Sequence, residues 1–147
     1  MMLRAHIWII LITLLTGCAT LPEQGVVLRE KNYSLTEIRG AIVSISGEPR
    51  RISENQREIY SQFFTRRKDP KFDPQKSKER LYALFSVLGD RRPYDIRIEV
   101  IVERRRGEAY EHHTYDDQIA KKIAVELKTR LNQGRDGRSV IDEFRPF

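Results

Sequence analysis

The segment His112–Asp117 holds the residue types best suited to chemistry in this 147-residue chain. It combines two adjacent histidines, His112 and His113, with two adjacent carboxylates, Asp116 and Asp117. Imidazole and carboxylate groups can bind a metal ion or transfer protons. Neighbouring side chains of a strand point to opposite faces, however, so the two histidines cannot easily share one ion, and paired acids before a helix are typical caps. A small hydrolase or metal-binding protein using this segment is therefore the alternative function, and no catalytic residue, metal ligand or cofactor is assigned.

Short runs of basic residues occur near the ends of the expected strands. Guanidinium groups bind phosphates and carboxylates through two parallel hydrogen bonds, so such runs suit an anionic ligand. Strand ends alternate between the two ends of an antiparallel sheet, which places three of these runs together and Arg91-Arg92 at the opposite end. The predicted anion-binding residues are Arg50, Arg51, Arg66, Arg67, Lys68, Arg104, Arg105 and Arg106. The alternative is that these loops are basic only for solubility.

The elements that would position these residues follow from the spacing of apolar side chains. Ser34 and Glu37 have the spacing of a capping box, and apolar residues three or four positions apart predict a helix over residues 35–45. The alternative is a strand, which the β-branched residues of this run and Gly40 would also allow. Gly47 would end this helix.

A second helix is expected toward the end of the chain. It would begin at Asp116 or Asp117, run to about Asn132 and turn one apolar face to the core. That face consists of Ile119, Ile123, Leu127 and Leu131. The residues beyond the helix are polar except for a few that could pack back onto the domain, namely Val140, Ile141, Phe144 and Phe147.

The pattern between the two helices is that of strands. Alternating apolar and polar residues over 95–103 are the clearest sign of a strand with one buried face. Further strands are expected over residues 50–53, 57–65, 80–88 and 109–115. A sheet with one apolar face needs a covering layer, which two amphipathic helices supply. The predicted fold class is α+β, with two helices packed on one face of an antiparallel sheet of four or five strands, in a single domain over residues 34–147.

The first eighteen residues have the pattern of an export signal. A positively charged start precedes the apolar run Ile7–Leu15, which is too short to span a bilayer. The run leads into Leu15-Thr16-Gly17-Cys18, which resembles the lipobox of bacterial lipoproteins. The resemblance implies that residues 1–17 are a signal peptide that is cleaved off and that the thiol of Cys18 carries lipid. It also implies that Ala19 directs the protein to the outer rather than the inner membrane.

Composition narrows the expected partners. Residues 18–33 would form the lipidated cysteine and a flexible tether, and no other cysteine is present to form a disulfide or act as a nucleophile. A formal charge of +6 would suggest nucleic acid in the cytosol, but an exported lipoprotein meets lipopolysaccharide and phospholipid headgroups instead. The expected partners are therefore the membrane, through Cys18, and an anionic envelope component or partner protein.

The layout expected for the mature domain is similar to that of several small envelope lipoproteins, including the lipopolysaccharide-assembly lipoprotein. This is a resemblance of architecture, and architecture does not fix function. The sequence favours a membrane-anchored envelope lipoprotein with a non-enzymatic binding or scaffolding role.

Overall fold

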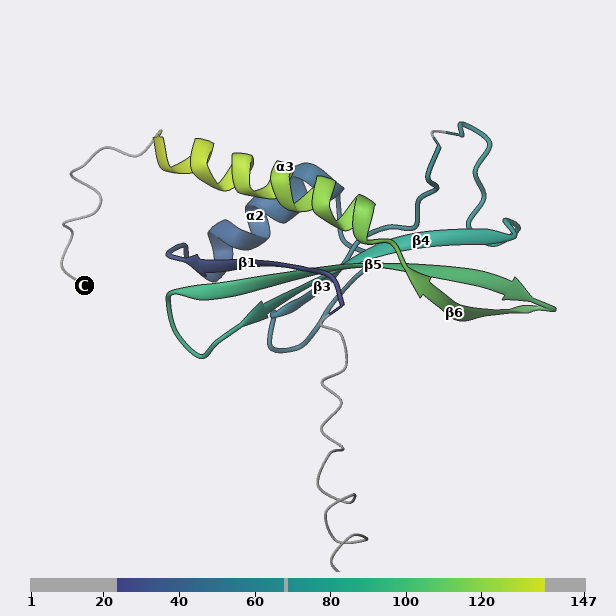
Figure 1. The fold of residues 1–147 in the computed structure, drawn as a ribbon, viewed down its shortest axis with the longest axis horizontal. Coiled ribbons are helices and arrows are strands. Elements are labelled where there is room, and N and C mark those ends of the chain that lie inside the picture. The colour runs from purple at the N-terminus through teal and green to yellow at the C-terminus, as the bar shows by residue number, and fades with distance from the viewer. Residues whose placement is uncertain (1–23, 68, 137–147) are drawn as a thin grey trace, which may run out of the picture.

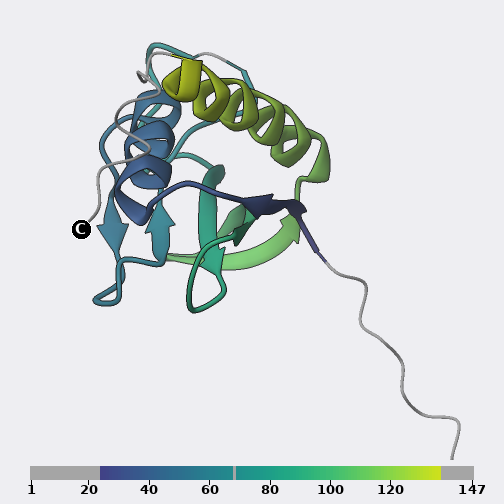
Figure 2. The same cartoon turned by 90° about the vertical axis from the view of Figure 1, so that its left-hand side faces the viewer.

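Six antiparallel strands form one sheet, and two helices lie on one of its faces (Figure 1). The computed structural model describes residues 24–67 and 69–136. Its elements are β1 (Val26–Lys31), α2 (Leu35–Ser46), β2 (Arg51–Ile52), β3 (Glu58–Tyr60), β4 (Glu79–Leu88), β5 (Tyr94–Arg106), β6 (Ala109–Tyr115) and α3 (Asp117–Asp136). Figure 2 shows both helices on the same side of the sheet. The predicted α+β class is confirmed, and the sheet has six strands where four or five were expected.

The capping box predicted for the first helix is present in α2. The Ser34 hydroxyl accepts a hydrogen bond from the Glu37 N–H, and the Glu37 carboxylate accepts one from the Ser34 N–H at 2.7 Å. The helix ends at Gly47, whose φ of 75° is a left-handed conformation that glycine adopts without strain. Ile38 and Ile42 of this helix are fully buried.

The central strands β4 and β5 pair over ten residues, from Glu79 opposite Arg104 to Leu88 opposite Asp95. Every second side chain of these strands points toward the helices and is buried. These side chains are Leu81, Ala83, Phe85 and Val87 of β4, and Ile96, Ile98, Val100 and Val102 of β5. Helix α3 adds Ala120, Ala124, Leu127 and Leu131 to the same cluster. The core therefore lies between the sheet and the helices, as the alternating pattern predicts.

The structure corrects the expectation that residues 18–33 form a tether, because Val26–Lys31 is strand β1. It pairs with the first half of β5, which β6 leaves open because β6 pairs only with residues 101–106. Val26 and Leu28 pack against the core cluster, and this burial of apolar side chains stabilises the pairing of β1 with the sheet. Gly25 precedes the strand with a φ of +85°, and a β-carbon there would lie 2.5 Å from the Ile98 carbonyl oxygen. The folded domain thus begins by Gly25 rather than at residue 34.

The strands at the other edge are shorter than predicted. Strand β2 has two residues and β3 has three, where residues 50–53 and 57–65 were expected. The β3 ladder is interrupted at Ser61, whose buried hydroxyl accepts a hydrogen bond from the Ala83 N–H at 2.9 Å. The chain then continues beside β4 and forms an isolated bridge between Phe64 and Leu81.

Several predictions fall on residues outside the described ranges. They concern the signal peptide, Cys18, Ala19, Lys68 and the apolar residues Val140, Ile141, Phe144 and Phe147. Within residues 24–67 and 69–136, neither helix is both long and apolar enough to cross a membrane.

Candidate anion-binding surface

The second face of the sheet is free of helices in the described part of the chain (Figure 2). The polar side chains that alternate with the core residues of β4 and β5 point to this face. On β4 they include Arg80 and Tyr82, and on β5 they include Glu103. Strands β2 and β3 add Arg51 and Tyr60, which are directly opposite each other in the pairing of these two strands.

Arginine guanidinium groups lie over aromatic rings on this face. The guanidinium carbon of Arg50 lies 4.1 Å from the centre of the Phe63 ring and 5.0 Å from that of Tyr82. Arg80 lies 3.9 Å from the same Phe63 ring and 3.6 Å from Tyr110, and Arg51 lies 4.2 Å from Tyr60. Such contacts occur about once per 70–80 residues in proteins, so five of them in one patch mark it as unusual. The Arg–ring surface comprises Arg50, Arg51, Tyr60, Phe63, Arg80, Tyr82 and Tyr110.

Arg80 anchors one side of the Arg–ring surface. Its Nε donates to Glu103 at 2.7 Å, another guanidinium nitrogen donates to the Pro74 carbonyl at 3.3 Å, and its side chain is only 13% exposed. The Tyr110 hydroxyl donates to the Ser77 carbonyl at 2.6 Å. Arg80 is therefore neutralised and held in place, and its role on this surface is to position the rings.

Arg50 and Arg51 differ from Arg80 in having no acidic partner among the described residues. Both side chains are exposed. Within residues 24–67 and 69–136, the only interactions that their guanidinium groups make are with aromatic rings. A ring covers the flat face of a guanidinium group and leaves the in-plane N–H donors available. These two arginines thus lie over rings while their side-chain donors bind no group of the part of the chain that the structure describes, which leaves them available to a phosphate or carboxylate.

The basic residues predicted to meet at one end of the sheet are divided by the structure. Arg66 forms ion pairs with Glu79 and with Asp116, the latter at 2.9 Å, and Arg104 reaches Glu79 at 3.4 Å. Arg50 and Arg51 instead lie beside Tyr60, which pairs with Leu84, five residues along β4 from Glu79. The two groups are separated because β2 is very short and pairs only with Ile59 and Tyr60, whereas residues 61–65 continue along β4 toward Glu79.

The remaining basic residues of the predicted set have varied surroundings. Arg106 pairs with Glu111 at 3.5 Å, and the Nε of Arg105 donates to the Gly107 carbonyl at 3.0 Å. Arg67 is exposed, and Lys68 is outside the described residues. The rings were missed at the sequence level because only the strand register brings Phe63, Tyr82 and Tyr110 together. The sequence gives one indication of this arrangement, since Arg80 and Tyr82 both fall on the side of β4 that faces away from the core.

The His112–Asp117 segment is not assembled into a site. The ring of His112 lies 4.7 Å from that of Tyr115, and the described residues contain no cluster of three or more His, Cys, Asp or Glu that could hold a metal ion. A hollow of about 170 Å³ borders both histidines together with Arg104, Arg106 and Glu111. Asp116 accepts a hydrogen bond from the Ile119 N–H at 3.1 Å, so it caps α3 as the simpler interpretation expected.

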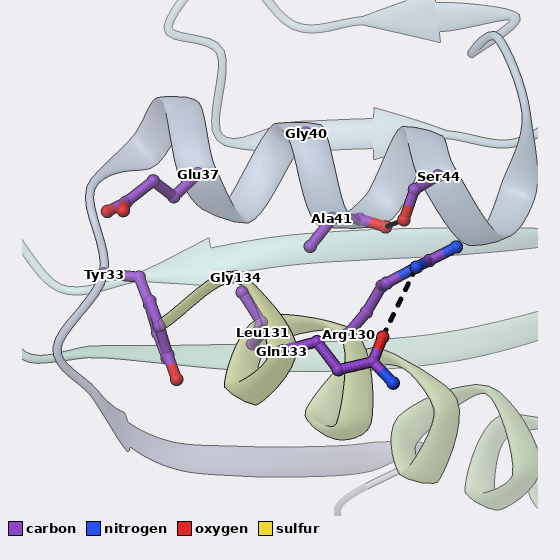
Figure 3. A pocket seen from close by; sticks show the side chains of 9 residues that line it. All are labelled: Tyr33, Glu37, Gly40, Ala41, Ser44, Arg130, Leu131, Gln133 and Gly134. Carbon is purple, nitrogen blue, oxygen red and sulfur yellow. Dashed lines mark hydrogen bonds between the residues drawn. The ribbon is translucent and has the colours of Figure 1, made fainter. Parts of the chain in front are cut away.

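A hollow of about 600 Å³ lies between α2 and α3 (Figure 3). Gly40, Ala41 and Ser44 face it from α2, and Arg130 and Gln133 from α3. The Arg130 guanidinium donates to the Gln133 amide oxygen at 3.3 Å, so these two polar side chains of α3 bond to each other on one side of the hollow. Nothing in its lining favours a particular ligand.

No protein-family model matches the sequence, and no curated protein is significantly similar to it. The function has to be argued from the residues themselves, and the Arg–ring surface is the arrangement best suited to binding.

The ion pair between Arg66 and Asp116 can be tested through the pH dependence of stability. Burial alone would raise the pKa of Asp116, but the Ile119 N–H and the Arg66 guanidinium hold this pKa below its ordinary value. A lowered folded-state pKa contributes stability above the unfolded-state pKa of about 4, and this stability is lost as the pH falls through the folded-state value. We expect Asp116→Asn to lower the free energy of unfolding by about 1 kcal/mol near neutral pH, measured by urea denaturation.

The difference between Asp116→Asn and the unmodified protein should vanish well below about pH 4, where the wild-type carboxylate is also protonated. Asp117→Asn is the matched control, because Asp117 is exposed in the first turn of α3. Its effect should be only a few tenths of a kcal/mol. A deficit for Asp116→Asn that is unchanged in acid would contradict the electrostatic explanation.

Proposed function

We propose that the protein is a lipid-anchored, non-enzymatic binding protein of the bacterial envelope, and that its Arg–ring surface binds an anionic envelope component. The observation that carries the proposal is that the guanidinium groups of Arg50 and Arg51 lie over rings without an acidic partner among the described residues. The net charge of +6 agrees in sign with such a ligand. The lipobox-like Leu15-Thr16-Gly17-Cys18 supports the anchor, and Ala19 supports the outer membrane.

The start of β1 bears on how far the domain would stand from the membrane. Gly25 is seven positions after Cys18, and a fully extended chain over seven such steps spans at most about 25 Å. A lipid on Cys18 would therefore hold the domain close to the headgroups. Electrostatic attraction to anionic lipid falls off within about 8 Å at physiological salt, so a short connection favours such contacts.

Binding through Arg50 and Arg51 can be tested with vesicles. We expect the double variant Arg50→Gln/Arg51→Gln to bind phosphatidylglycerol vesicles about tenfold or more weakly, because each arginine near an anionic surface contributes about 1 kcal/mol. The measurement is co-sedimentation of the unlipidated Cys18→Ser protein with vesicles at low and at physiological salt.

The matched control is Arg91→Gln/Arg92→Gln, which removes the same charge from the exposed turn between β4 and β5. This control should keep most of the affinity. If both double variants lost the same affinity, only net charge would matter and the solubility interpretation of the basic residues would stand.

The anchor is tested separately by Cys18→Ser in the full-length protein expressed in a bacterium with an outer membrane. The Cys18 thiol is the group that would carry the lipid. We therefore expect this variant to leave the membrane fraction at high salt and to lack the added mass of the lipid in a mass spectrum. A variant that stayed with the membranes at high salt would refute the lipid anchor.

A further inference from the structure

An apolar hollow adjoins the Arg–ring surface at the edge of the sheet. It has a volume of about 400 Å³, within the range of small-molecule sites. Its apolar walls are Ile45 of α2, Phe64 and Phe85 from the sheet side, and Ile119 and Ile123 of α3. We call it the edge pocket, because β2 pairs only with Ile59 and Tyr60, and no described strand covers the second side of the segment that follows.

The polar groups that line the edge pocket already bond to the protein. The Ser46 hydroxyl donates to the Ile42 carbonyl at 2.8 Å, and the Ser61 hydroxyl donates to the Gln62 carbonyl at 2.8 Å. No buried donor is left for a polar ligand in this part of the described chain, apart from groups at the rim. The interior therefore suits a hydrocarbon chain.

Phe63 links the edge pocket to the Arg–ring surface. It lines the pocket, and the guanidinium carbon of Arg50 lies 4.1 Å from its ring centre. Gln62, which also lines the pocket, donates from its side-chain amide to the Glu48 carbonyl at 3.2 Å, and this bond holds the segment leading to Arg50 beside the pocket. A cationic group without an acidic partner in the described residues thus lies next to an apolar hollow.

We propose that the edge pocket holds the hydrocarbon chain of an anionic single-chain amphiphile, and that Arg50 binds its headgroup. This inference deepens the proposed function, on which it rests for the anionic character of the ligand. Glu126 lies on the α3 rim of the pocket, where its carboxylate would repel an anion. The headgroup therefore points away from α3, toward Phe63 and Arg50. A phosphate or a carboxylate headgroup satisfies the same guanidinium donors.

Calorimetric titration below the critical micelle concentration tests the proposal, using the chain from residue 18 onward with Cys18→Ser. The probes are lysophosphatidylglycerol, myristate and the zwitterionic lysophosphatidylcholine. We expect both anionic probes to bind more tightly than lysophosphatidylcholine. Comparing the two anionic probes distinguishes a phospholipid from a free fatty acid as the source of the ligand.

Two substitutions separate the chain from the headgroup. Ile123→Trp fills the pocket and should weaken binding of every probe about tenfold or more, whereas Lys122→Trp at the exposed neighbouring position should not. Arg50→Gln should weaken only the anionic probes, by about tenfold, and Arg91→Gln should leave them unchanged. Equal binding by Ile123→Trp and the unsubstituted protein would overturn the proposal, and so would indifference of all probes to Arg50→Gln.

Methyl NMR of the unsubstituted protein tests the pocket without a substitution that could perturb folding. Lysophosphatidylglycerol should shift the signals of Ile45, Ile119 and Ile123 and leave those of Ile101, on the open face of the sheet, in place. Shifts confined to the open face would overturn the proposal that the pocket is the binding site.

The two proposals can fail separately. If vesicle binding still depended on Arg50 and Arg51 but no amphiphile entered the pocket, this inference would fail while the proposed function stood. Both proposals would be refuted if Arg50→Gln left amphiphile binding unchanged and Arg50→Gln/Arg51→Gln left vesicle binding unchanged.

Discussion

The pairing of β4 with β5 is the constraint on which the rest of the structure depends. Its ten-residue register assigns one alternation of both strands to the core and the other to the open face. A shift of one residue would turn Phe85 and Ile98 outward and Arg80 and Glu103 inward, so the buried apolar set fixes the register. The same pairing therefore creates both the core beneath α2 and α3 and the Arg–ring surface on the opposite side.

The two kinds of arginine environment have different consequences for binding. Arg66 and Arg104 share the carboxylate of Glu79, so an incoming anion would have to compete with a charge already in place. Arg50 and Arg51 stack on rings, and an exposed contact of this kind stabilises by only about 0.5–1 kcal/mol. That contact restricts the side chain without consuming its N–H donors. A count of basic residues thus overstates the binding surface, and the pairing partners decide which arginines matter.

Local signals in the sequence predicted much of the fold. The capping box of Ser34 and Glu37 located the start of α2, and the alternation over residues 95–103 located β5 with its buried face. Strand β1 was missed because its apolar part is only three residues long, and only the uncovered half of β5 gives it a partner. The Arg–ring surface could not be predicted either, because Arg50, Phe63 and Tyr110 meet only once the register and the shortness of β2 are known.

The claim that Arg50 and Arg51 are oriented and available to an anion is tested most directly by NMR of the arginine side-chain N–H groups. Glycerol phosphate, a soluble fragment of an anionic headgroup, is added while the Nε–H signals are followed. The account predicts that the signals of Arg50 and Arg51 shift first and farthest, whereas those of Arg66, Arg80 and Arg104 scarcely move. Equal shifts of all arginines, or larger shifts of Arg91 and Arg92, would contradict it.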